Sequence, residues 1–101
     1  MRVFESYLLI LESGAGGYVA AADEAKVREL AAHVGGQGWV FGCRSGGYPV
    51  GKKRGSRRVV DLTLLWTMGQ PGEQALAPAL EAAGNRHRTL YHLRKTWPGD
   101  V

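Results

Sequence analysis

The sequence GGYPVGKKRGSRRVVDLTLLWTM, residues 46–68, decides the predicted fold. Glycine and proline in its first half are typical of a turn or hairpin loop. In its second half, apolar residues recur at every second position, which is the period of a β-strand. This apolar side comprises Val60, Leu62, Leu64, Trp66 and Met68. We therefore expect a long strand over residues 57–68 that enters the core directly after a charged loop.

The loop before this strand is strongly basic. Its cations are Lys52, Lys53, Arg54, Arg57 and Arg58. A positive loop held by a buried strand is a suitable device for binding a polyanion. A run of charge is also typical of a solvated hairpin end, and the pattern alone leaves both interpretations open.

Length and composition favour one compact domain. The chain has 101 residues, of which 45 % are hydrophobic, and this is enough for a single two-layer core. We expect one domain over residues 1–97 and a short tail over residues 98–101. No apolar run approaches the roughly 18 residues of a membrane span, and Glu5 stands where a signal peptide would be apolar. We expect a soluble, unexported protein without a membrane partner.

The positive charge of the chain is concentrated in two stretches. The formal net charge is +4, yet no acid lies between Glu29 and Asp61 or between Glu81 and Asp100. These stretches hold Arg44, the five loop cations, Arg86, Arg88, Arg94 and Lys95. Clustered cations at a pI near 9.6 favour a nucleic-acid surface, with lipid headgroups as the other possibility.

The remaining segments predict two helices and three further strands. A strand over residues 2–12 is apolar on both sides, so its second face needs a cover from this chain or from a partner. The glycine-rich residues 13–17 are expected to end this strand in a turn. Helices are expected over residues 19–34 and 73–83, the second ending at Gly84-Asn85. Pro78 should either kink the second helix or lie in its first turn, with the regular turns beginning near Ala77. Short strands are expected over residues 39–43 and 86–97.

The order strand, helix, strand, strand, helix, strand indicates an α+β fold. It predicts the ferredoxin-like βαββαβ arrangement, in which two helices cover one face of a four-stranded antiparallel sheet. The other face would then be open for contact, and it would carry Tyr7, Leu9, Thr63 and Leu65.

Signatures of catalysis and metal binding are missing from the sequence. There is no Gly-x-Ser-x-Gly, no His-Glu-x-x-His and no paired-carboxylate spacing. Cys43 has no second cysteine for a disulfide or a zinc site, and His33 has no ligand partner at helical spacing. We therefore expect no enzyme, no cofactor, no metal and no small-molecule substrate.

Three motifs resemble the family of ribosomal protein six of the small subunit. They are Met-Arg-Val-Phe-Glu at residues 1–5, Tyr-Pro-Val-Gly-Lys-Lys at residues 48–53, and the basic strand GNRHRTLYHLRK at residues 84–95. Their order and intervals match that family over nearly the whole chain.

The resemblance implies a structural ribosomal protein that binds small-subunit rRNA on the platform together with ribosomal protein eighteen. The positions that match the family's RNA-binding cations are Arg2, Lys52, Lys53, Arg86, Arg88, Arg94 and Lys95. The apolar second face of the first strand would be completed by the protein neighbour. The expected location is a ribosome, in a bacterial cytoplasm or in a mitochondrial or other organellar matrix.

A second hypothesis belongs to another class of protein. The chain would be a small ferredoxin-like interaction or regulatory module that dimerises through its open sheet face and binds no RNA.

Overall fold

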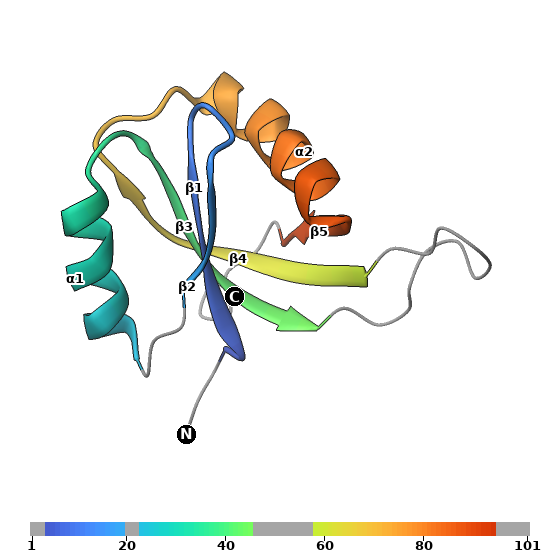
Figure 1. Cartoon of the computed structure of the whole chain (residues 1–101), viewed down its shortest axis with the longest axis horizontal. Helices are drawn as coiled ribbons and strands as arrows, with labels where there is room; N and C mark the ends of the chain where they lie inside the picture. Colours follow the sequence, from blue (N-terminus) through green and yellow to red (C-terminus); the bar gives the residue numbers. More distant parts are fainter. Residues whose placement is uncertain (1–3, 20–22, 46–57, 95–101) are drawn as a thin grey trace.

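A computed structural model describes residues 4–19, 23–45 and 58–94 of the chain. The elements are β1 (Ser6–Leu11), β2 (Gly16–Val19), α1 (Glu24–Val34), β3 (Gly38–Ser45), β4 (Arg58–Met68), a 3-10 turn (Glu73–Ala75), α2 (Leu76–His87) and β5 (Thr89–Leu93). One sheet lies between the two helices (Figure 1). Within the described ranges, no helix is long and apolar enough to cross a bilayer.

The five strands form a mixed sheet in the order β2-β1-β3-β4-β5. All pairs are antiparallel except β4 and β5, which run parallel. The α+β class is confirmed, whereas the four-stranded antiparallel sheet is wrong in strand number and in pairing. A ferredoxin-like sheet would place the first strand beside the long strand, but here β1 pairs with β2 and β3.

The extra strand, β2, lies in a glycine-rich segment that the sequence predicts to be a turn. Glycine here permits close pairing: a Cβ atom on Gly16 would lie 2.0 Å from the carbonyl oxygen of Leu9, and Gly16 has a φ of +136°. The hairpin pairs Leu9 with Gly17 and Leu8 with Tyr18. The predicted turn is present at residues 12–14, which include Gly14, whereas Gly16 and Gly17 belong to an edge strand.

The two helices cover opposite faces of the sheet, so the expected common face is a wrong prediction. Leu8 and Ile10 of β1 share a cluster with Ala79 and Ala83 of α2. The alternate residues of β1 share the other cluster with Val27 and Ala31 of α1. The reason lies in the strand order and directions (Figure 1). The connections β2–α1–β3 and β4–α2–β5 both lead toward the same edge of the sheet, but β2 and β3 run opposite to β4 and β5. Two crossovers of the same handedness therefore place their helices on opposite faces of the sheet.

A β-bulge in β4 changes which face its side chains reach. The pairing with β3 shifts between Val40 and Phe41, so that Val40 lies opposite Trp66 while Phe41 lies opposite Leu64. Leu65 is the extra residue. Leu64 therefore packs on the α2 side, whereas Trp66 packs on the α1 side, and the single apolar stripe predicted for this strand is divided between both cores.

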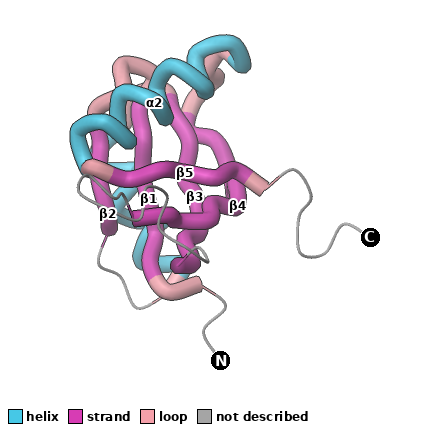
Figure 2. The backbone as a smooth tube through the Cα atoms, turned by 90° about the vertical axis from the view of Figure 1, so that its right-hand side faces the viewer, coloured by secondary structure: helices cyan, strands magenta, loops and turns pink. Residues whose placement is uncertain are grey.

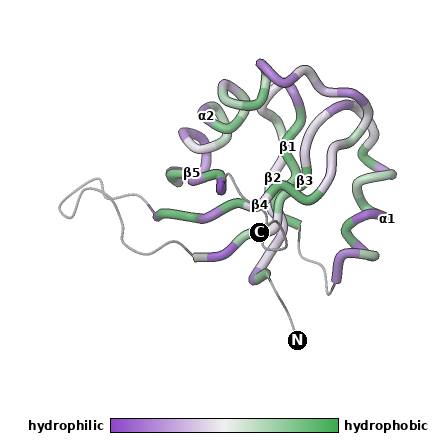
Figure 3. The backbone as a smooth tube through the Cα atoms, turned by 180° about the vertical axis from the view of Figure 1, so that it is seen from behind, coloured by the Kyte–Doolittle hydropathy of each residue, from purple (hydrophilic) through white to green (hydrophobic). Residues whose placement is uncertain are grey.

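Helix α1 begins later than predicted because Asp23 caps it. The Asp23 side chain accepts a hydrogen bond from the Lys26 N–H at 3.0 Å, and Glu24 occupies the first turn, where the helix dipole favours an acid. The helix ends at Gly35, whose φ of 70° suits glycine. Figure 3 shows hydrophobic and hydrophilic residues alternating along this helix, consistent with one buried side.

Helix α2 confirms one expectation and corrects another. Pro78 lies in the first turn, where its missing N–H breaks no helical hydrogen bond. The predicted stop at Gly84-Asn85 is wrong, because the helix continues to His87 and ends at Arg88 in the left-handed conformation, with φ 54°. Gly84 serves close packing instead: a Cβ atom there would lie 2.7 Å from the carbonyl oxygen of Thr89.

Candidate nucleic-acid interface

Four side chains from four different elements meet at one end of the molecule. They belong to Tyr18 of β2, Arg58 of β4, His87 of α2 and Tyr91 of β5. Tyr18 lies opposite Leu8, so it faces the side of the sheet that α2 covers. β2 and β5 are the two edges of the sheet, and they approach each other because the sheet is strongly curled (Figure 2).

Hydrogen bonds connect these four side chains into a chain of donors. Tyr91 donates its hydroxyl proton to the Tyr18 oxygen at 2.9 Å, and Arg58 Nη2 donates to the same oxygen at 3.2 Å. Tyr91 has only one hydroxyl proton, so the 2.6 Å contact from its oxygen to His87 Nδ1 requires that Nδ1 carries a proton and donates it. The Tyr18 oxygen receives two donors and keeps its own proton for another acceptor.

Burial and neighbouring charge keep this cluster in defined protonation states. Burial lowers the pKa of His87, and the nearby Arg86 and Arg58 guanidinium groups lower it further. Burial raises the pKa of the Tyr91 phenol above its ordinary value, and the hydrogen bond to Tyr18 adds to this effect. At neutral pH, His87 and Tyr91 are therefore uncharged and the positive charge of the network resides on Arg58.

Three of the predicted RNA-binding arginines lie near this network. Arg58 begins β4 and lies opposite Thr89, the residue after Arg88. Arg86 lies in the last turn of α2, and its guanidinium donates to the Gly14 carbonyl at 2.6 Å. Arg88 is exposed and, within the described ranges, neither it nor Arg58 makes an ion pair with a carboxylate. The ends of β4 and α2 thus form a cationic surface, which we call the basic end.

The other predicted cations divide into two groups. Arg94 is exposed at the far end of β5, six residues of extended chain from Arg88 or about 20 Å at about 3.3 Å per residue. It is therefore not part of the basic end. The remaining six lie outside the described residues: Arg2, Lys52, Lys53, Arg54, Arg57 and Lys95.

The predicted protein interface does not lie on an open face of the sheet. Tyr7 and Leu9 are each 5 % exposed and Thr63 is 4 % exposed, while Leu65 is half-buried. Tyr7 and Leu9 belong to the cluster that α1 covers, and Leu65 packs against it. The cover that the apolar second face of β1 required comes from this chain's own helix, so Tyr7 and Leu9 are not available to a partner.

A small hollow opens beside Tyr18 and Arg58. Its volume is about 80 Å³, and its walls are Glu5, Ser6, Tyr18, Cys43, Arg58, Val59 and Val60. Cys43, which the sequence left without a role, contributes a thiol. Burial raises the pKa of this thiol to about 11, outweighing the opposite effect of the Ser6 hydrogen bond. Cys43 is therefore a protonated wall residue at neutral pH rather than a nucleophile.

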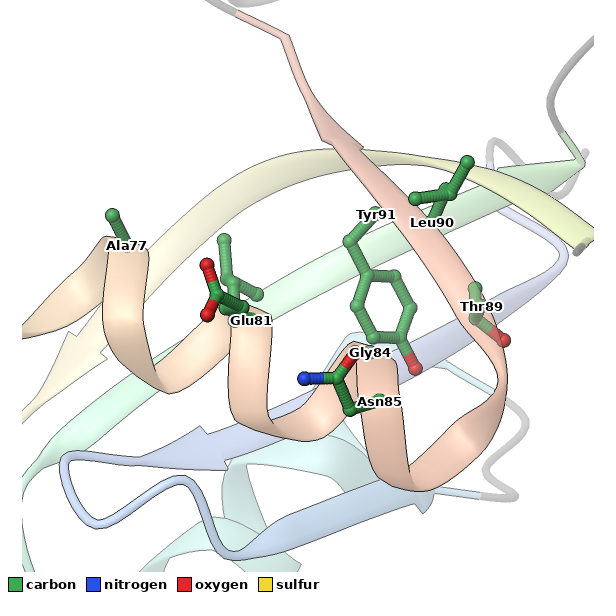
Figure 4. Close-up of a pocket in the computed structure, with 8 residues that line it drawn as sticks. Ala77, Glu81, Gly84, Asn85, Thr89, Leu90 and Tyr91 are labelled. Atoms are coloured by element: carbon green, nitrogen blue, oxygen red, sulfur yellow. The ribbon is translucent and has the colours of Figure 1, made fainter. Parts of the chain in front are cut away.

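Two larger depressions lie elsewhere on the surface. One, of about 290 Å³, lies between α2 and β5, where the Tyr91 ring extends toward Gly84 and the Glu81 and Asn85 side chains stand nearby (Figure 4). The other, of about 300 Å³, lies beside Trp66, whose ring carries the Arg28 guanidinium 4.0 Å above its centre. Neither collects several cations. In the part of the chain that the structure describes, no group of His, Cys, Asp or Glu side chains could hold a metal ion.

Sequence reasoning found the arginines of the basic end but missed Tyr18 and the role of His87. Tyr18 lies between the predicted turn at residues 13–17 and the helix predicted from residue 19, so no pattern marked it as facing a core. His87 and Tyr91 are four residues apart, but this spacing has no meaning across the boundary between a helix and a strand.

Comparisons with protein-family models, with curated proteins and with solved structures gave no match for this chain.

Proposed function

We propose that this protein is a non-catalytic RNA-binding protein and that the basic end is its RNA contact. The observation that carries the proposal is the position of Arg58, Arg86 and Arg88, which two acid-free stretches of sequence supply to one end of the fold. Arginines without carboxylate partners are suited to phosphate groups, because each presents several N–H donors and keeps its charge at any physiological pH.

Two further features agree with binding to a polyanion. The five cations of residues 52–58 include Arg58, so the chain enters the basic end directly from its most positive stretch. The His87 and Tyr91 side chains add polar contacts without adding negative charge, since both are neutral at pH 7. Contacts of this kind bind the phosphate backbone and do not select a sequence.

The small ribosomal subunit is the setting that we propose for this activity, with its rRNA as the ligand. The support for it is the three motifs at residues 1–5, 48–53 and 84–95, of which only the third lies mostly within the described residues. The order of the strands differs from the ferredoxin-like arrangement that the motifs implied. A shared surface with ribosomal protein eighteen would have to use residues other than Tyr7, Leu9 and Thr63, since these are buried.

Salt-dependent RNA binding tests the proposal. We expect an unstructured oligoribonucleotide to bind, and log K to fall linearly with log salt by about 0.7 per phosphate contact. Replacing Arg58 and Arg88 by alanine should weaken binding and reduce the slope. Lys26→Ala is the matched control, because Lys26 lies on α1 and pairs with Glu29 at 3.3 Å. Equal effects of the two sets of changes would contradict the proposal.

Sedimentation through sucrose gradients tests the ribosomal setting separately. The tagged protein should move with the small subunit at low and at high salt. Loss of this association at modest salt would indicate nonspecific attraction of a basic protein. A position at the top of the gradient at both salt concentrations would contradict the ribosomal setting.

The alternative hypothesis is a homodimer that forms through an open sheet face and binds no RNA. The burial of Tyr7 and Leu9 in the cluster that α1 covers speaks against that interface. Size-exclusion chromatography at low protein concentration tests the alternative, and we expect a monomer.

A further inference from the structure

We propose that the hollow beside Tyr18 and Arg58 binds a terminal phosphate of an RNA strand. This inference rests on the proposed function, and it adds that one end of the RNA is recognised in addition to its backbone. It follows from the unused donors at the hollow, from the contacts that hold these donors in place, and from the size of the hollow.

The first argument is the supply of unused donors. The Tyr18 oxygen already accepts hydrogen bonds from Arg58 and Tyr91, so the Tyr18 hydroxyl proton remains for an external acceptor. Arg58 uses one N–H on Tyr18, and the rest of its guanidinium group stays available at the exposed start of β4. Tyr18 is 40 % exposed, so a ligand can reach its hydroxyl.

The second argument is that the donors are held in place before a ligand arrives. His87 donates to Tyr91, Tyr91 donates to Tyr18, and the guanidinium carbon of Arg58 lies 5.7 Å from the centre of the Tyr18 ring. His87 and Tyr91 therefore act as positioning residues. Donors fixed in this way bind an anion with little loss of side-chain freedom.

The third argument is size. The hollow of about 80 Å³ has room for a group of a few atoms, such as one phosphate, and not for a nucleoside. An internal phosphodiester carries a sugar on both sides, whereas a terminal phosphate carries one sugar and can enter end-on. A small hollow of this kind consequently selects the end of a strand.

One wall residue opposes an anion. Glu5 lines the hollow, and its carboxylate would repel the phosphate, although Arg58 and the Tyr18 hydroxyl lie at the same opening. The direction in which a change at Glu5 shifts the affinity therefore tests the proposal. Glu5→Gln should tighten binding of a phosphorylated strand and leave binding of an unphosphorylated strand less affected.

The experiment compares three decaribonucleotides of one sequence, with a 5′-phosphate, with a 5′-hydroxyl or with a 3′-phosphate, by fluorescence anisotropy. We expect the full-length protein to bind the two phosphorylated strands about tenfold more tightly than the strand without a terminal phosphate, as charge-assisted hydrogen bonds to one group allow. Inorganic phosphate should remove the extra affinity of the phosphorylated strands and leave the binding of the 5′-hydroxyl strand unchanged.

Three variants locate the effect. Tyr18→Phe and Arg58→Gln should bring the ratio between 5′-phosphate and 5′-hydroxyl strands close to one. Arg88→Ala is the control, because it should weaken both strands equally and leave the ratio unchanged. Thermal melting establishes that each variant is folded, and Glu5→Gln, which should raise the ratio, tests the site even where Arg58→Gln lowers stability.

The possible failures are distinguishable. If the wild-type protein binds all three strands with equal affinity, the terminal-phosphate site is wrong while RNA binding stands. If Tyr18→Phe and Arg58→Gln leave the preference for a phosphorylated strand unchanged, the hollow is not its site. If none of the strands binds, the proposed function fails, and this inference fails with it.

Discussion

The hydroxyl group of Tyr91 donates a hydrogen bond to the hydroxyl group of Tyr18 at 2.9 Å, although their strands are the two opposite edges of the sheet. This bond joins β2 to β5 across a curled sheet. It also connects the end of α2, through His87, to the hairpin formed by β1 and β2. The candidate site therefore depends on the same contacts that hold the two edges together.

The Tyr18–Tyr91 bond should contribute measurably to stability. Tyr18→Phe and Tyr91→Phe should each lower the free energy of unfolding by about 0.5–1 kcal/mol, since each removes one partner of an exposed hydrogen bond. In urea denaturation, the double variant should cost clearly less than the sum of the single variants, because the same bond is lost in each. Additive costs would show that the bond does not couple the two edges.

The protonation of His87 should make the fold sensitive to acid. The pKa of His87 is lower in the folded protein than its ordinary 6.5, chiefly because of burial and then because of Arg86 and Arg58. The unfolded chain therefore takes up the proton first, so stability is complete above about pH 6.5 and falls as the pH decreases toward the folded pKa. Urea midpoints at pH 7.5 and pH 5 measure this loss.

Two histidine variants serve as the controls for the acid effect. His87→Gln should reduce the difference between the two midpoints, whereas His33→Gln, at an exposed position of α1, should leave it unchanged. An undiminished difference in His87→Gln would assign the acid sensitivity to other groups.

The periodicity of apolar residues predicted the helices and strands more accurately than it predicted which strands pair. The long strand and α1 follow from apolar residues at periods of 2 and 3.6, which are local properties of the sequence. The choice of β2 and β3 as neighbours of β1 depends on contacts between distant residues. The bulge at Leu65 similarly depends on how β3 pairs with β4, and a strict period of two cannot indicate it.

Glycine was the main source of error in the sequence analysis. Gly16 and Gly84 were taken to mark a turn and the end of a helix, but each lies inside an element where another segment's backbone comes too close for a side chain. The arginines of the basic end were predicted from charge, which needs no fold. Tyr18 could not be predicted, because its role exists only once the two edges of the sheet meet.

Gly84 tests whether close packing outweighs the usual preference of a helix for alanine over glycine. Replacing a glycine inside a helix by alanine ordinarily stabilises by about 1 kcal/mol. Here the added Cβ would lie 2.7 Å from the Thr89 carbonyl oxygen, so Gly84→Ala should instead destabilise by about 1–3 kcal/mol in urea denaturation. Gly17→Ala is the control, since a Cβ at Gly17 meets no atom within 4 Å. A stabilised Gly84→Ala variant would contradict this account of the α2–β5 contact.

Cys43 should react slowly with alkylating reagents in the folded protein. Because burial raises its pKa from 9.0 to about 11, the thiolate fraction at pH 8 should be about a hundredfold lower than in the unfolded chain. Iodoacetamide labelling at pH 8, with and without urea, measures the ratio of the labelling rates in the unfolded and folded protein. Equal labelling rates would show that Cys43 is accessible.

The raised pKa of Cys43 also implies that the contribution of this thiol to stability is present below pH 9 and is lost as the pH rises toward 11.

Arg88 should separate the stability of the fold from its binding function. Its φ of 54° is a conformation in which glycine is favoured at the end of a helix, and most other residues are strained there. Arg88→Gly should therefore stabilise the protein by about 0.5–1 kcal/mol in thermal or urea denaturation. Because it removes a cation from the basic end, the same change should weaken RNA binding and lower its salt slope.

The matched variant for this last prediction is Arg88→Ala, which removes the same charge but keeps the strained backbone. It should weaken RNA binding as much as Arg88→Gly does, without the gain in stability. If both variants bind RNA like the wild type, Arg88 is not an RNA contact. If the two variants are equally stable, the left-handed conformation at the end of α2 carries no strain.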